Sequence, residues 1–93
     1  MKDVKGRRVW IVGASSGIGR ALAKELAARG AILALSSRDA AALTVLLTEI
    51  GSGHAVYPLD VTDADAVAHA AGAITDDGKL DSVVFMEIGR AHV

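Results

Sequence analysis

Four short apolar runs alternate with helical patterns along this chain, and this alternation limits the possible fold more than any other sequence feature. The runs occupy residues 9–12, 32–35, 55–59 and 83–86. Each has the length and β-branched content of a buried strand. The runs begin 23, 23 and 28 residues apart, which leaves room for a helical crossover and makes successive strands parallel. The sequence therefore predicts an α/β fold with a doubly wound parallel sheet that stops after its fourth strand.

Apolar side chains between these runs repeat with the period of an α-helix. The three sets are Ile18, Leu22 and Leu26; Leu43, Leu46, Leu47 and Ile50; and Val67, Ala70, Ala71 and Ile74. Gly30 and Gly51 are expected to end the first and second helices. Thr62, with Asp65 three residues later, is typical of a capping box that opens the third. Pro58 lacks an N–H group, so the third strand is expected at an edge of the sheet.

Composition narrows the class of protein. The chain has 93 residues, which suffices for at most one small domain. Ten basic and 11 acidic residues argue against a nucleic-acid partner, and the absence of cysteine excludes disulfides and thiolate chemistry. The first apolar run is too short for a signal peptide or a membrane helix. We expect a cytoplasmic protein without a membrane partner.

A glycine-rich loop follows the first predicted strand, at residues 13–19. Gly13 would allow a tight turn, Gly17 would let the backbone approach a pyrophosphate, and Gly19 would let the helix pack closely on the strand. The N–H groups of Ser16 to Ile18 would then face the phosphates at the helix N-terminus. The alternative is a loop that merely needs small residues. No Gly-Lys-Ser/Thr follows, which excludes a Walker loop.

These residues resemble a known family. Residues 13–23, Gly-Ala-Ser-Ser-Gly-Ile-Gly-Arg-Ala-Leu-Ala, are similar to the cofactor loop of the short-chain dehydrogenase/reductase family. Two further segments match in order: Leu-Asp-Val-Thr-Asp at 59–63 and Leu-Asp-Ser-Val-Val at 80–84. The resemblance extends from residue 7 to about residue 86. Val12 stands where the family usually has threonine.

The resemblance implies a Rossmann-type sheet, with residues 1–86 forming part of a dinucleotide-binding Rossmann domain, whose cofactor the end of the second strand predicts to be NADP. It also implies that the whole protein is a homo-oligomeric oxidoreductase, which transfers a hydride between a nicotinamide dinucleotide and a small carbonyl or alcohol substrate. By family position, Asp60 would accept a hydrogen bond from the adenine amino group and Val61 would pack on the ring. Alternatively, Asp60 and Asp63 only organise the turn before the third helix.

The end of the second strand bears on the choice of cofactor. Rossmann proteins that use NAD place an acidic residue there, on the ribose 2′-hydroxyl. This chain instead has Ser36-Ser37-Arg38, and a guanidinium can bind a 2′-phosphate. The sequence thus predicts NADP(H), with Arg38 as the main contact and Ser15 and Ser37 assisting. In the alternative, Arg38 is a solvated loop residue, and Ser37 or Asp39 caps the next helix.

The catalytic residues of the family cannot be placed on this chain. Family members end the fourth strand with Asn-Asn-Ala-Gly, and a catalytic serine and a Tyr-x-x-x-Lys pair follow. Phe85 and Met86 stand where the asparagines would be, and Tyr57, the only tyrosine, lies in the third predicted strand. We therefore expect the chain to be inactive by itself. Two interpretations stay open: the cofactor-binding half of an NADP-dependent oxidoreductase, or a non-catalytic dinucleotide-binding or regulatory module.

No metal site is expected. The aspartates at 60, 63 and 65 lack the glycine and terminal glutamate of a calcium loop. His54 and His69 have no partner at metal-ligand spacing, and both are expected at the surface. Trp10 is expected in the core.

The last seven residues, 87–93, have the sequence Glu-Ile-Gly-Arg-Ala-His-Val. The codons GAG ATC GGA AGA GCA CAC GTC TGA would encode them, and apart from the first base this string matches a widely used sequencing adapter. We interpret residues 87–93 as a non-native read-through tail. The alternative is a genuine short C-terminus.

Overall fold

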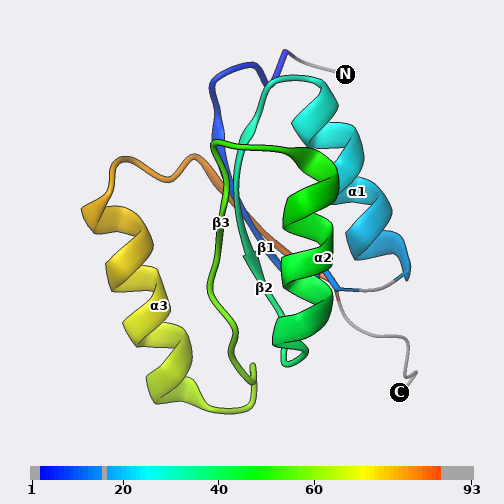
Figure 1. Cartoon of the computed structure of the whole chain (residues 1–93). Helices are drawn as coiled ribbons and strands as arrows, with labels where there is room; N and C mark the ends of the chain where they lie inside the picture. The colour runs from blue at the N-terminus through cyan, green and yellow to red at the C-terminus, as the bar shows by residue number, and fades with distance from the viewer. Residues whose placement is uncertain (1–2, 16, 87–93) are drawn as a thin grey trace.

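A four-stranded parallel sheet forms the centre of the molecule, in a computed structural model that describes residues 3–15 and 17–86. The strands, in chain order, are β1 (Arg8–Val12), β2 (Ile32–Ser36), β3 (Ala55–Val56) and β4 (Ser82–Phe85). The helices between them are α1 (Gly17–Ala28), α2 (Ala40–Ile50) and α3 (Ala64–Asp76). The strand order is β3-β2-β1-β4, and α1 and α2 cover one face of the sheet while α3 covers the other (Figure 1). The predicted doubly wound α/β fold is confirmed.

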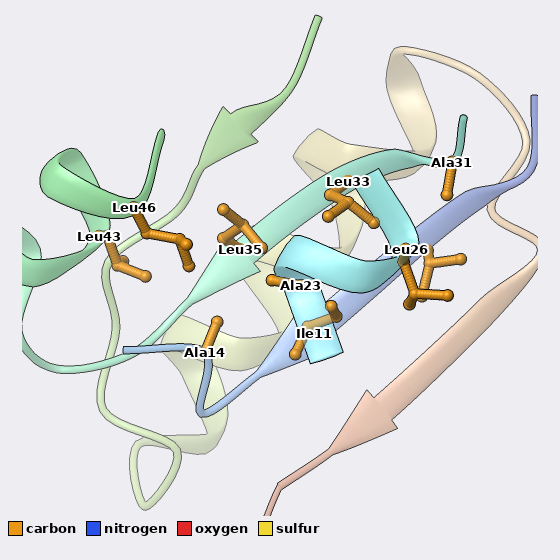
Figure 2. Packing of buried hydrophobic residues seen from close by; sticks show 10 residues of the cluster. Ile11, Ala14, Ala23, Leu26, Ala31, Leu33, Leu35, Leu43 and Leu46 are labelled. Carbon is orange, nitrogen blue, oxygen red and sulfur yellow. The ribbon is translucent and has the colours of Figure 1, made fainter. Parts of the chain in front are cut away.

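Alternation along β1 divides the core into two layers. Val9 and Ile11 belong to a cluster with buried residues of α1, α2 and β2. Figure 2 shows Ile11 of this cluster beside Ala23 of α1. Trp10 and Val12 point the other way, into a smaller cluster that α3 covers. Trp10 is buried, as predicted. Both faces of β1 are therefore apolar, as is typical of a strand in the middle of a parallel sheet.

The third strand, Ala55–Val56, is shorter than the apolar run at residues 55–59 predicts. The Tyr57 N–H donates to the Leu35 carbonyl at 2.8 Å, and the Leu59 N–H donates to the Ser37 carbonyl at 2.9 Å. The segment thus stays beside β2 although regular pairing ends at Val56. The predicted edge position of this strand is confirmed.

The apolar face of α1 differs from the prediction. Ile18 was expected on the buried face but is 75% exposed. The buried residues of the helix are Gly19, Ala23 and Leu26. A Cβ on Gly19 would collide with the Gly13 carbonyl, so the helix turns its glycine, and not its isoleucine, toward the strand. The predicted faces of α2 and α3 are confirmed by the burial of Leu43, Leu46, Ala70 and Ile74.

The start of α3 also corrects the prediction, because Asp63 is the N-cap and Thr62 is not. The Asp63 carboxylate accepts from the Ala66 N–H at 3.1 Å. The Thr62 hydroxyl instead donates to Asp60 Oδ1 at 2.7 Å. Since the helix begins at Ala64, Asp63 has the N-cap position, and the predicted box with Asp65 does not form.

An ionic contact ties the two helices on one face of the sheet. The Arg20 guanidinium donates to the Glu49 carboxylate, and Lys24 lies 3.5 Å from the same oxygen. The hydrogen bond from Arg20 is the main cause that lowers the pKa of Glu49 below its ordinary value. Arg20, although it follows the glycine loop directly, is thus engaged with α2. In the part of the chain that the structure describes, none of the helices has the length and apolarity to span a membrane.

Candidate functional site

The predicted site residues come from segments that follow different strands but meet at one edge of the sheet. The glycine loop follows β1, Ser37 and Arg38 follow β2, and Asp60 and Val61 come after the β3 segment. The carboxyl ends of parallel strands lie at the same edge. In open α/β sheets, the crevice outside this edge is where ligands bind.

The three loop glycines have different surroundings. Gly13 has a φ of +94°, and a Cβ there would lie 2.5 Å from the Met86 carbonyl oxygen. Gly19 lies against the Gly13 carbonyl, so it too serves close packing. Gly17 has a φ of +55°, and a Cβ there would meet no atom within 4 Å. The backbone at Gly17 therefore borders open space at the N-terminus of α1, where a helix favours negative charge.

Ser36 holds the beginning of this loop. Its carbonyl accepts from the Gly13 N–H at 2.7 Å and from the Ala14 N–H at 3.1 Å. Farther along the loop, Ser15 is half-buried and Ile18 is exposed. Ser16 lies outside the described residues, so its predicted phosphate contact stays a prediction.

Arg38 projects from the end of β2. Its side chain is 78% exposed, and its Nη1 lies 3.8 Å from Asp60 Oδ2. Asp39 caps α2 by accepting from the Ala42 N–H at 3.0 Å, which confirms the capping role that the sequence left open. Ser37 is buried, and its hydroxyl oxygen accepts from the Asp39 N–H at 3.0 Å. The turn after β2 is thus held by its serine and its aspartate, while the arginine extends into solvent.

Asp60 organises the turn before α3 and faces Arg38. Its Oδ1 accepts from the Thr62 N–H at 2.9 Å and from the Thr62 hydroxyl. These two bonds, with a smaller contribution from Arg38, lower the pKa of Asp60 below its ordinary value. The turn-forming role of Asp60 is confirmed. Val61 is 50% exposed, so an apolar side chain lies open beside this carboxylate.

The end of β4 closes the other side of the loop. The Met86 N–H donates to the Val12 carbonyl at 2.8 Å, and Met86 contacts the large core cluster. Phe85 is 62% exposed. The residues at the two asparagine positions therefore differ in role: one packs under the glycine loop and one faces solvent. Residues 87–93 lie outside the described residues, and the read-through interpretation stays a prediction.

His54 accepts a backbone hydrogen bond that the sequence does not indicate. Its Nδ1 accepts from the Leu33 N–H at 3.0 Å, and burial lowers the pKa of its imidazole below the ordinary value. His54 is partly exposed and His69 is exposed, in agreement with the expected surface positions. Across residues 3–15 and 17–86, we find no group of three histidine or acidic side chains that could hold a metal.

Sequence analysis does not identify two residues that hold this edge of the sheet, Ser36 and Met86. In the sequence Ser36 is only a non-acidic residue at a strand end, and nothing local indicates that its carbonyl holds the loop. Met86 differs in the sequence only by standing where the family has asparagine. The signal for both lies in strand pairing, because β2 and β4 flank β1 and bring their ends to the same glycine.

Comparisons with known proteins agree with this geometry. The family model described as short chain dehydrogenase matches residues 7–85. An uncharacterized oxidoreductase of Mycobacterium bovis is 38% identical over 89 residues, which cover 87% of this chain and 26% of that protein. The chain thus spans about a quarter of the length of this curated relative.

Two solved structures share the fold of the chain. An NADH-dependent reductase complexed with NAD is 33% identical, with a TM-score of 0.73 over 89% of this chain and 36% of that one. A metagenomic short-chain oxidoreductase in complex with NADP is 30% identical, with a TM-score of 0.80 over 88% of this chain and 39% of that one. Both nicotinamide cofactors thus occur among its structural neighbours. The chain, with its parallel sheet and its glycine loop, belongs to the short chain dehydrogenase family.

Proposed function

We propose that this chain binds NADP(H) and forms the adenosine and pyrophosphate half of the cofactor site of an oxidoreductase. In the whole protein, the nicotinamide would exchange a hydride with a carbonyl or alcohol carbon, and this chemistry belongs to the cofactor. The chain contributes binding and orientation. The described residues fit such a ligand, because Gly17 borders open space at the start of a 12-residue helix.

In this proposal Arg38 determines the preference for NADP(H) over NAD(H). Its guanidinium is largely exposed at the end of β2, and the neighbouring Ser36 and Ser37 bring no negative charge to the 2′ position. The carboxylate of Asp60 lies 3.8 Å away, which is loose enough for the guanidinium to turn to a phosphate. Charge-assisted hydrogen bonds to a 2′-phosphate contribute about 1.5–3 kcal/mol, or roughly ten- to a hundredfold in affinity.

The test is a titration of the 93-residue chain with NADPH and NADH. We expect the wild type to prefer NADPH, and Arg38→Asp to lose roughly ten- to a hundredfold in NADPH affinity. NADH affinity should be unchanged or higher, because an acidic residue at this strand end can accept from the ribose 2′-hydroxyl. Arg7→Asp is the matched control, because it makes the same change of charge at an exposed residue beside the amino end of β1. Unchanged NADPH affinity in Arg38→Asp would refute the assignment.

A second candidate function is a non-catalytic dinucleotide-binding or regulatory module. Met86, packed under the glycine loop, and Phe85, exposed at the end of β4, favour it because neither can act as the family's asparagines do. The source locus, read beyond the codon for Met86, discriminates the two. A frame that continues through a serine and a Tyr-x-x-x-Lys pair supports the enzyme, and a genuine stop after Val93 supports the module.

A further inference from the structure

Ser36 joins two strands to the glycine loop through both its backbone and its side chain. Its carbonyl accepts from Gly13 and Ala14, and its hydroxyl oxygen accepts from Trp10 Nε1 at 2.8 Å. Ser36 is 0% exposed, and Trp10 is also buried. A buried indole N–H needs a partner, because it has lost its hydrogen bonds to water.

The pairing of β1 with β2 explains this contact. Trp10 lies opposite Ala34, and Ser36 lies opposite Val12. All four side chains therefore point to the same face of the sheet. The indole reaches diagonally across the ladder, from the middle of β1 to the last residue of β2. This Trp10–Ser36 hydrogen bond, called the side-chain tie below, thus fixes the end of β2, where the Ser36 carbonyl accepts from the N–H groups of the glycine loop.

The direction of the glycine loop depends on the Ser36 carbonyl. The Gly13 and Ala14 N–H groups both turn inward to Ser36, so they are not directed at a phosphate. A bound pyrophosphate would take its backbone donors from the residues after Ala14. A shift of the Ser36 carbonyl would move the turn, and with it the start of α1.

We infer that Ser36 is a positioning residue for the phosphate loop: Trp10 holds Ser36, and Ser36 holds the turn at Gly13 and Ala14. The effect on dinucleotide affinity rests on the proposed function. The effect on the turn does not, because it is measurable in the ligand-free chain. The two are therefore tested separately.

The first measurement is amide hydrogen exchange in the ligand-free chain, for Ser36→Ala and for Trp10→Phe. Both variants break the side-chain tie and leave the backbone of Ser36 in place. We expect exchange at Gly13 and Ala14 to become roughly two- to tenfold faster, as the loss of one hydrogen bond predicts. The Tyr57 amide, bonded across the other side of β2 to the Leu35 carbonyl, is the internal reference.

Two control variants separate positioning from general destabilisation. Ser36→Thr retains the hydroxyl and should restore slow exchange at Gly13 and Ala14. Asp63→Ala removes the cap of α3, so it lowers stability without touching the tie, and the exchange of Gly13 relative to Tyr57 should stay unchanged. Exchange at Gly13 and Ala14 that is equal in the wild type, Ser36→Ala and Trp10→Phe would overturn the inference.

The second measurement compares two ligands. We expect Ser36→Ala and Trp10→Phe to weaken NADPH roughly two- to tenfold and to leave 2′-AMP unchanged, because 2′-AMP lacks the pyrophosphate. Equal losses for both ligands, or faster exchange with unchanged NADPH affinity, would overturn the positioning role. A wild-type chain that binds neither ligand refutes the proposed function instead, and the exchange data still decide whether Ser36 holds the turn.

Discussion

Arg8 and Asp81 are joined by two hydrogen bonds of equal length. The Asp81 N–H donates to the Arg8 carbonyl at 2.8 Å, and the Arg8 N–H donates to the Asp81 carboxylate at 2.8 Å. The Arg8 guanidinium also donates to the carbonyls of Ile74 and Lys79, each at 3.2 Å. The aspartate of the Leu80-Asp81 motif thus closes the α3–β4 crossover at the amino end of β1, which is the edge of the sheet opposite the glycine loop.

Removal of the Asp81 carboxylate should destabilise the chain without affecting the cofactor site. Asp81→Ala leaves the Arg8 N–H without its acceptor, and we expect the free energy of unfolding in urea to fall by about 1 kcal/mol. Asp81→Asn keeps an acceptor oxygen and should lose much less. Equal losses in the two variants would mean that the carboxylate contributes by its charge and not by this bond.

Gly17 and Gly53 are a matched pair of positions for a test of phosphate binding, because only Gly17 belongs to the glycine loop. Both have positive φ, +55° and +93°, and a Cβ on either meets no atom within 4 Å. Alanine should therefore cost about 1 kcal/mol of stability at either position. Only Gly17→Ala should also weaken NADPH in a titration, because its methyl group would project where a pyrophosphate approaches. NADPH affinity that falls equally in both variants would argue against the loop as the phosphate site.

Unfolding should depend on pH through His54. Burial lowers the pKa of His54 below its ordinary value of 6.5, so the folded chain binds the proton less tightly than the unfolded chain. Neutral His54 therefore contributes fully to stability above about pH 6.5, and this contribution is lost as the pH falls through the folded-state pKa of His54. Protonation also removes the acceptor of the Leu33 N–H. Urea unfolding at a series of pH values measures how the free energy of unfolding changes with pH.

His54→Asn is the control for this pH dependence. Its amide oxygen can accept the Leu33 N–H near the position of Nδ1, and it does not titrate. We expect stability near the wild-type value at neutral pH and a flatter profile from about pH 5 to 7. The imidazole lines a cavity of about 260 Å³ together with Arg8, Tyr57 and Asp77. A wild-type profile already flat over this range would show that solvent in the cavity compensates the lost bond.

Thr62 and Asp63 should have separable effects at the start of α3. Asp63→Ala removes the N-cap and should cost about 1 kcal/mol in thermal or urea unfolding. Thr62→Ala should affect helix stability less, and should raise the pKa of Asp60 toward its ordinary value of 3.8 by removing one of its two bonds from Thr62. Carboxyl titration by NMR measures that pKa.

The lowered pKa of Asp60 also determines how the stability of the chain changes in acid. Because the carboxylate of Asp60 is stabilised in the folded chain, its contribution is present above the unfolded pKa and is lost as the pH falls through the folded one. Thr62→Ala should therefore reduce the acid sensitivity of the chain. A greater loss of helicity in Thr62→Ala than in Asp63→Ala would reverse the cap assignment.

Most of the fold follows from local patterns in the sequence. The apolar runs, the helical spacing of Leu43 and Leu46, and the missing N–H of Pro58 each act through nearby residues. They predicted the alternation of strands and helices, the parallel sheet and the edge position of β3. The glycine loop was recognisable for the same reason, since a strand, three spaced glycines and a helix are contiguous in the chain.

The errors concern contacts between residues that are far apart in the sequence, or a choice between adjacent residues. The spacing predicts Ile18 on the buried face, but α1 packs with Gly19 against Gly13, which leaves Ile18 exposed. The bond from the Leu33 N–H to His54 is not predicted, because only the packing of the segment before β3 beside β2 brings the two groups together. Thr62 and Asp63 are both good N-cap residues, and the bond of Thr62 to Asp60 decided between them.

The sequence by itself therefore determined the fold class, the family and the segments that contain the candidate site. Only the tertiary structure decided which side chains hold that site. Trp10 and Ser36 are 26 residues apart, and their hydrogen bond exists because β1 and β2 pair in one register. Periodicity specifies which face of an element is apolar, but a directional contact between two elements depends on how they pack.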